Sequence, residues 1–171
     1  MKNLILLLTI LSVSVINAQA YKGSGDNKFQ VGANLQDNAS GINASFDYGI
    51  GDNISVGLSS TYLLGVDNTL KDNEDDDLDA NFDNRFDLRV RFNANIGNVI
   101  NIDQNFDLYP GLSIGLKNFG GHLGARYFFT DGFGVYTELN IPIARYKTGD
   151  LTDAETLHNQ FSVNIGATFN L

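Results

Sequence analysis

The C-terminal end of the chain alternates strictly between two kinds of side chain. Over residues 161–171 every odd position is apolar, and every even position is serine, threonine, asparagine or glycine. Successive side chains of a β-strand point to opposite faces of the sheet. This segment therefore predicts a strand with one apolar face and one face of small polar residues.

The same period of two recurs along most of the chain. Together with the terminal segment, it predicts eight strands, at residues 28–36, 41–50, 54–64, 85–96, 105–116, 121–129, 133–143 and 161–171. Membrane-spanning barrels of this kind have an even number of antiparallel strands, each of about 9–11 residues. The pattern predicts an all-β fold, an eight-stranded antiparallel up-and-down transmembrane β-barrel.

Alternation alone does not decide which face is inside, so a soluble lipocalin-like barrel or a β-sandwich is the alternative fold. The lysines help to decide, because all those beyond the first 20 residues fall at strand ends or in connections: Lys22, Lys28, Lys71, Lys117 and Lys147. A face of glycine, serine and asparagine with a few arginines and aspartates suits a narrow lumen better than a water-exposed sheet.

The connections between the predicted strands differ in length. With the N-terminus in the periplasm, residues 51–53, 97–104 and 130–132 face the periplasm, whereas the long connections 65–84 and 144–159 face outward. Short inner and long outer connections are typical of outer-membrane barrels. The aromatic residues sort into two belts in this arrangement, one near each membrane surface.

Residues 1–20 have the features of a cleaved secretory signal peptide. Lys2 precedes an apolar run over residues 4–15, and Ala18, Gln19 and Ala20 form a small-residue cleavage site. We expect cleavage after Ala18 or Ala20 and a barrel domain over residues 21–171. The alternative is a retained membrane anchor, but the apolar run is shorter than the ~20 residues that span a bilayer.

Composition removes several classes of function. The chain has no cysteine, which excludes disulfides, thiolate metal sites, cysteine nucleophiles and lipoprotein acylation. A formal net charge of −9 argues against a nucleic-acid partner, because phosphate neutralisation needs a basic face. A length of 171 residues suits one domain, and we expect no cofactor and no metal.

On the signal sequence, the number of strands and the amphipathic terminal strand, the chain resembles the small outer-membrane β-barrels typified by OmpX and the barrel domain of OmpA. The resemblance covers residues 21–171, although those proteins usually end in an aromatic residue and this chain ends in Leu171, with Phe169 two places before it. The segment LKNFGGHLGARYFFTDGFGVY, residues 116–136, looks like an uncharacterised branch. The resemblance implies the bacterial outer membrane as location, and outer-membrane lipid, lipopolysaccharide and the barrel-assembly machinery as partners of a monomer.

Charged residues on the polar faces of the strands form the main candidate site: Asp47, Arg89, Arg91, Asp107, Arg126 and Glu138. Charge inside a narrow barrel is costly unless it is paired. A turn centred on Asp131 sets Arg126 diagonally across from Glu138 and predicts an ion pair between them. One interpretation is a gate or a polar conduction path. We favour a hydrogen-bonded plug, because side chains just fill an eight-stranded interior.

A second, weaker candidate is an acidic run in the connection 65–84. Its carboxylates suggest a cation site at Asp75, Asp76, Asp77 and Asp79. The run lacks the spacing of an EF-hand loop, so a solvated, self-repelling loop is the favoured interpretation.

The two histidines raise the hypothesis of a lipid-modifying enzyme. Neither His122 nor His158 belongs to the His-x-Ser pair that the lipid A deacylase type carries, and a G-x-S-x-G elbow is missing as well. We expect both histidines near the outer rim and no catalytic residue. The leading hypothesis is a non-enzymatic outer-membrane protein with a structural or surface-interaction role. The alternatives are a lipid-modifying enzyme and a soluble periplasmic lipocalin-like binder.

Overall fold

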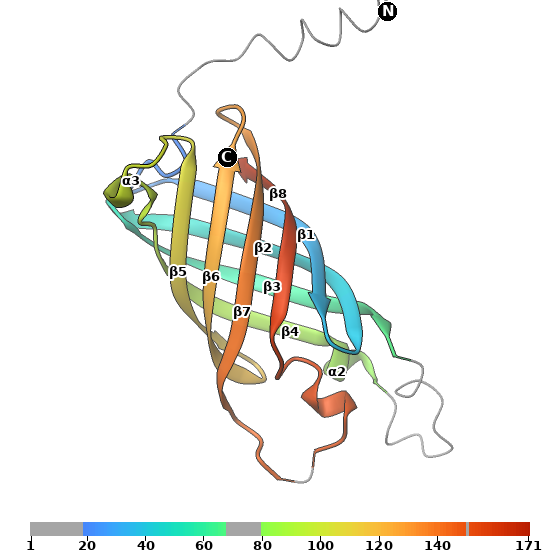
Figure 1. Ribbon diagram of the computed structural model, residues 1–171. Coiled ribbons are helices and arrows are strands. Elements are labelled where there is room, and N and C mark those ends of the chain that lie inside the picture. Colours follow the sequence, from blue (N-terminus) through green and yellow to red (C-terminus); the bar gives the residue numbers. More distant parts are fainter. Residues whose placement is uncertain (1–18, 68–79, 150) are drawn as a thin grey trace, which may run out of the picture.

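The computed structural model describes residues 19–67, 80–149 and 151–171, and within them the chain forms one closed antiparallel barrel whose strands pair in sequence order (Figure 1). The strands are β1 (Asn27–Gln36), β2 (Ala39–Gly51), β3 (Ile54–Val66), β4 (Phe86–Ala94), β5 (Phe106–Gly115), β6 (Asn118–Phe128), β7 (Phe133–Arg145) and β8 (Ser162–Asn170). The predicted eight-stranded antiparallel barrel is confirmed.

Both described chain ends lie at the same end of the barrel, which we call the terminal end (Figure 1). The short helix α3 (Gly97–Ile100) lies there too. The opposite end, here the loop end, carries α2 (Phe82–Arg85) and the 3-10 turn η3 (Ala154–Thr156). The acidic run with its proposed cation site lies outside the described residues, as does most of the expected signal peptide.

The largest difference from the predicted strands is at the start of β6, which begins at Asn118 rather than at residue 121. The pairing with β7 is irregular at this point, because Phe119 pairs with Ala144 whereas Gly120 pairs with Pro142. Such a bulge leaves one extra residue on β7, here Ile143, and a bulge accommodates a proline, which has no N–H for the ladder. The burial of β6 alternates without a break from Asn118 onward, but Gly120 and Gly121 have no side chains to mark a face. The sequence pattern therefore missed the first three residues of the strand.

The distribution of polar and apolar side chains is inverted relative to a water-soluble protein. Large aliphatic side chains in the middle of strands are exposed on the outer wall, such as Val90 at 58% and Ile165 at 54%. The largest fully buried side chains include Arg126, Gln30 and Asn93, all in the lumen. A soluble lipocalin-like barrel has the opposite distribution, with an apolar interior and a polar exterior. Within the described residues, no helix has the length and hydropathy needed to cross a bilayer.

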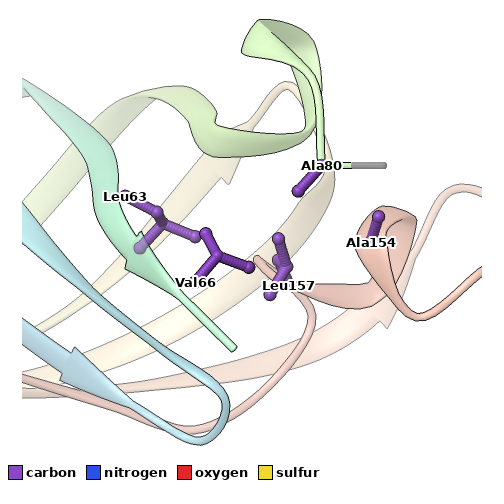
Figure 2. Packing of buried hydrophobic residues seen from close by; sticks show 5 residues of the cluster. All are labelled: Leu63, Val66, Ala80, Ala154 and Leu157. Carbon is purple, nitrogen blue, oxygen red and sulfur yellow. The ribbon is translucent and has the colours of Figure 1, made fainter. Parts of the chain in front are cut away.

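A small apolar cluster at the loop end anchors the connection between β7 and β8 to the barrel. It joins Leu63 and Val66 of β3 to Ala80, Ala154 and Leu157 (Figure 2). Leu63 and Leu157 are almost completely buried. Burial of apolar side chains at this position holds η3 against the mouth of the barrel.

Candidate functional site

The lumen contains a polar network to which every strand contributes. Alternate residues of each strand point inward. The members with hydrogen bonds or ion pairs across the lumen include Gln30 (β1), Asp47 (β2), Ser55 (β3), Arg91 and Asn93 (β4), Asp107 and Tyr109 (β5), His122 and Arg126 (β6), Glu138 (β7) and Asn164 (β8). The strands are therefore joined through the interior as well as through their backbones.

Two buried arginines organise the charges of this network. Nη2 of Arg91 lies 2.6 Å from Oε2 of Glu138, and Nε of Arg91 lies 3.1 Å from Oδ1 of Asp47. Nη2 of Arg126 lies 2.8 Å from Oδ2 of Asp107, and Nη1 lies 3.9 Å from Oδ2 of Asp47. Asp47 thus lies between the two guanidinium groups, and five of the six predicted lumen charges form one cluster.

The predicted ion pair between Arg126 and Glu138 is wrong. The register does place them diagonally, since Arg126 pairs with Tyr136 and Glu138 with Gly124. However, Asp107 lies directly opposite Arg126 on the other neighbouring strand, and Arg91 crosses the lumen to Glu138. A directly opposed partner is closer than a diagonal one, and contacts across the lumen arise only when the barrel closes.

Arg89, the sixth predicted charge, belongs to a separate group nearer the loop end. It forms an ion pair with Asp87, two residues away on the same face of β4. Its Nη2 also donates to the backbone carbonyl of His158 at 3.4 Å. Arg89 therefore links the lumen to the connection that covers the loop end.

Tyr109 is a central member of the network that the sequence reasoning did not single out. Its ring lies 4.7 Å from the guanidinium carbon of Arg126 and 5.6 Å from that of Arg91. Its hydroxyl accepts a hydrogen bond of 3.1 Å from Nε2 of Gln30. Cation–π contacts of this kind are strongest where water is excluded. The sequence signal that could identify Tyr109 is an aromatic residue at an inward-facing position of a predicted strand.

Gly124 makes room for the ring of Tyr109. A Cβ added at Gly124 would overlap the Tyr109 ring atoms, which are held in place by Gln30 and the two arginines. We expect Gly124→Ala to destabilise the barrel by about 1–3 kcal/mol, the usual cost of overpacking. Urea unfolding in lipid vesicles, followed by circular dichroism, measures this. Gly132→Ala is the matched control, because a Cβ there meets nothing within 4 Å; equal midpoints for both variants would contradict the packing role.

His122 lies inside the lumen, which corrects the expectation that it sits near the outer rim. Its Nε2 is 2.7 Å from Oδ1 of Asn93, and its ring centroid is 6.4 Å from that of Tyr109. The strand β6 starts at Asn118, three residues earlier than predicted, so His122 lies within the strand, paired with Gly111 of β5 and Asn140 of β7.

His158 lies at the loop end as expected, in a segment held down by several side chains of the barrel. Asn118 donates through Nδ2 to the His158 carbonyl at 2.8 Å, and Gln36 donates through Nε2 to the Leu157 carbonyl at 2.6 Å. Arg145 donates through Nη2 to the Asn159 carbonyl at 3.0 Å. The connection between β7 and β8 is thereby seated over the mouth of the barrel.

The seating of this connection is expected to depend on pH through His158. Burial of the ring is the largest cause of a lowered His158 pKa, although the nearby Asp87 carboxylate opposes the shift. The docked segment therefore favours neutral histidine, whereas the undocked segment takes up a proton below the ordinary value of about 6.5. Docking should weaken as pH falls from there toward the lowered pKa, by at most about tenfold per pH unit for one proton.

Hydrogen-exchange protection of residues 151–161, compared at several pH values, measures this docking. In the variant His158→Gln the dependence on pH should disappear from this segment. Protection that stays constant below pH ~6.5 in the wild type would exclude His158 as its origin.

The terminal end of the barrel is occupied by the residues that precede β1. Tyr21 is 1% exposed, and its hydroxyl donates to the carbonyls of Ile54 at 2.6 Å and Gly51 at 3.0 Å. Burial, assisted by the nearby Asp26 carboxylate, raises the pKa of Tyr21 to about 12. The hydroxyl is therefore a stable hydrogen-bond donor, and the segment covers this mouth.

Chemically, the interior offers charges that are already paired. A polar cavity under the β7–β8 connection, lined by Asn34, Arg89, Asn140, His158 and Asn164 among others, has a volume of about 10 Å³. That is room for about one water molecule. Among the described residues, no group of three or more histidine, cysteine, aspartate or glutamate side chains is arranged to hold a metal.

Comparisons with known proteins give a family and a fold. The model of a family described as "Family of unknown function (DUF6646)" matches residues 11–171. The crystal structure of the N-terminal β-barrel domain of Pseudomonas aeruginosa OprF is similar, with a TM-score of 0.54 and 12% identity over 88% of this chain and 100% of that one. The solution structure of Outer Membrane Protein G from Pseudomonas aeruginosa has a TM-score of 0.46 and 12% identity over 88% and 99% of the two chains.

No curated protein matches the chain. At 12% identity the OprF domain shows the fold alone, which is that of an outer-membrane barrel. The resemblance to small outer-membrane barrels is confirmed at this level.

Proposed function

The chain belongs to the family DUF6646, whose function is unknown. We propose that it is an integral protein of the bacterial outer membrane, non-enzymatic, with a plugged lumen and a structural or surface-interaction role. The proposal includes a monomer surrounded by outer-membrane lipid and lipopolysaccharide, inserted by the barrel-assembly machinery, with the terminal end in the periplasm. No cofactor and no nucleic-acid partner take part.

The observation that carries the proposal is the inverted barrel. Aliphatic side chains such as Leu58, Val90 and Ile114 lie side by side on β3, β4 and β5, and each is more than half exposed. In water such a continuous apolar wall would drive aggregation, whereas in hydrocarbon it is the favourable surface. In the interior, Arg91 pairs with Glu138 and Asp47, and Arg126 pairs with Asp107.

Two aromatic clusters support the same placement. Near the loop end, Tyr62, Phe82 and Phe86 form ring contacts with centroids 5.6 Å apart. Near the terminal end, rings of β6, β7, β8 and β1 follow one another around the wall. Outer-membrane barrels have a girdle of aromatic residues at each membrane surface.

Membrane fractionation combined with gel mobility tests the location. Folded outer-membrane barrels resist detergent, so the protein should be found in the outer-membrane fraction and should migrate differently before and after boiling. Recovery in the soluble periplasmic fraction, with a mobility that heating leaves unchanged, would favour the lipocalin-like alternative.

A plugged lumen predicts little steady conductance in a planar bilayer. The Arg91–Glu138 pair crosses the interior, the buried Arg126–Asp107 pair lies within it, and Tyr21 covers the terminal mouth. An eight-stranded barrel filled by side chains leaves no continuous water path. We expect no stable channel openings from the purified monomer at neutral pH; large, long-lived openings would contradict the plug and support a pore.

The structural use of both histidines supports a non-enzymatic role. His122 is enclosed in the lumen with Asn93 and Tyr109, and the backbone of His158 anchors a connection. The lipid-modifying alternative makes a separate prediction, a changed lipid A acylation pattern in a deletion strain. Identical lipid A in the deletion and parent strains is the expected result.

A further inference from the structure

The connection between β4 and β5 exposes a group of aliphatic side chains at the terminal end. Val99 is 65% exposed, Ile100 40% and Ile102 71%. The neighbouring turns at this end are polar, for example Asp52 and Asn53 between β2 and β3. Adjacent exposed aliphatic side chains on a short connection mark a surface that another apolar phase covers.

The opposite side of this connection is polar and attached to the barrel. Asn98 donates through Nδ2 to the Tyr21 carbonyl at 3.0 Å, and the Gly97 N–H donates to Oδ1 of Asp107 at 3.1 Å. Val99 and Ile100 follow Asn98 at about 100° and 200° around the helix axis, given 3.6 residues per turn. They therefore lie away from the N-terminal segment that Asn98 binds, and α3 projects from the side of the barrel (Figure 1).

This connection adjoins one end of a row of aromatic rings. The row runs from Tyr127 through Phe129, Phe133 and Phe169 to Phe29, with centroids 5.6, 6.3, 5.7 and 6.3 Å apart. It follows the outer wall over β6, β7, β8 and β1 at the terminal end. We call it the aromatic girdle.

The girdle meets the connection at Tyr127. The Tyr127 hydroxyl donates to Oδ2 of Asp103 at 3.5 Å, which places the residue after Ile102 at the height of the girdle. Over β4 and β5 the wall has Phe106 alone at the corresponding position of β5, paired with Tyr127. The aliphatic group of the connection is thus continuous with the surface that the girdle presents to lipid.

We propose that the α3 connection is a membrane-interface anchor, in which Val99, Ile100 and Ile102 enter the lipid leaflet at the terminal end and complete the girdle over β4 and β5. Asn98 and Asp103 remain at the headgroup level. This inference rests on the proposed membrane location. The lipid interface is the phase that covers Val99, Ile100 and Ile102, because it accommodates aliphatic side chains next to tyrosine and phenylalanine.

Single-cysteine spin labels test the anchor cleanly, because the natural chain has no cysteine. The variants Ile102→Cys, Ile165→Cys and Asp52→Cys are labelled and reconstituted in phosphatidylethanolamine–phosphatidylglycerol vesicles. Collision with oxygen reports lipid and collision with a nickel complex reports water. The label at 102 should lie roughly 5–10 Å below the headgroup level, shallower than 165, and the label at 52 should be in water.

The outcomes separate the anchor from the membrane location. If the label at 165 is in lipid while the label at 102 is as accessible to nickel as the label at 52, the proposed anchor is wrong and the membrane location stands. If the label at 165 is also in water, the membrane location itself is wrong. If 102 is shielded from both reagents and shows dipolar coupling between labels, a second copy covers the surface and the anchor is overturned.

A second measurement, tryptophan fluorescence, controls for any change in structure caused by the spin label. The chain has no tryptophan, so Ile102→Trp introduces a unique fluorophore. Lipids brominated near the headgroup should quench it more strongly than lipids brominated near the chain end. Equal fluorescence in brominated and unbrominated vesicles would overturn the proposal.

Discussion

Replacing Arg126 by leucine should lower the free energy of unfolding by about 3–5 kcal/mol, because it leaves the buried Asp107 carboxylate without its cation. Arg126 is 1% exposed, and its Nε and Nη2 both donate to Oδ2 of Asp107, at 3.1 and 2.8 Å. It also donates to Oδ1 of Asn95 at 2.8 Å. Urea unfolding in lipid vesicles, followed by circular dichroism and gel mobility, measures the change.

A double variant shows whether the lost stability comes from the stranded charge. Adding Asp107→Asn to Arg126→Leu removes the unpaired carboxylate and keeps an acceptor for the Gly97 N–H, which Asp107 binds at 3.1 Å. Most of the stability should return. Lys147→Leu is the control, since Lys147 is 76% exposed in its ion pair with Glu155 and its loss should leave the midpoint unchanged. If the urea midpoint of Arg126→Leu equalled that of the wild type, the Arg126–Asp107 pair would not contribute to stability.

Replacing Ile165 by arginine should cost about 2–4 kcal/mol of folding free energy in a bilayer, the penalty for a cation near the midplane of a barrel's lipid face. Ile165 lies in the middle of β8, between Ala33 and Thr137, and is 54% exposed on the outer wall. The measurement is the folded fraction in vesicles as a function of urea, read from heat-modifiable mobility.

Two controls isolate the effect of the lipid. Ile165→Leu changes the shape of the side chain without adding charge and should fold like the wild type. Asp52→Arg places the same side chain in an exposed turn of the terminal end, where water solvates it. If Ile165→Arg folded as well as Asp52→Arg, the outer wall at this height would face water and the membrane location would be wrong.

The number of strands and their two faces were predictable from the sequence alone. A period of two is a local property of the chain, and it assigned Phe161, Val163 and Ile165 to one face and Asn164 to the other without knowledge of any partner strand. The structure has these faces: Ile165 is exposed, whereas only 3% of Asn164 is exposed. The placement of the charges also followed, because inward positions are set by the same alternation.

Which charges meet was decided only by the tertiary structure. Arg91 on β4 reaches Glu138 on β7, and these strands are neither adjacent in sequence nor paired in the sheet. Such a contact depends on the tilt and stagger with which the barrel closes, and the alternation of residues does not encode either. The Arg126–Asp107 pair depends instead on the register between β5 and β6, which a period of two alone does not fix. Tyr109 contacts Arg91 and Arg126 together only in the closed barrel. Local pattern determines the side of the wall on which a residue lies, and closure of the barrel determines what it faces.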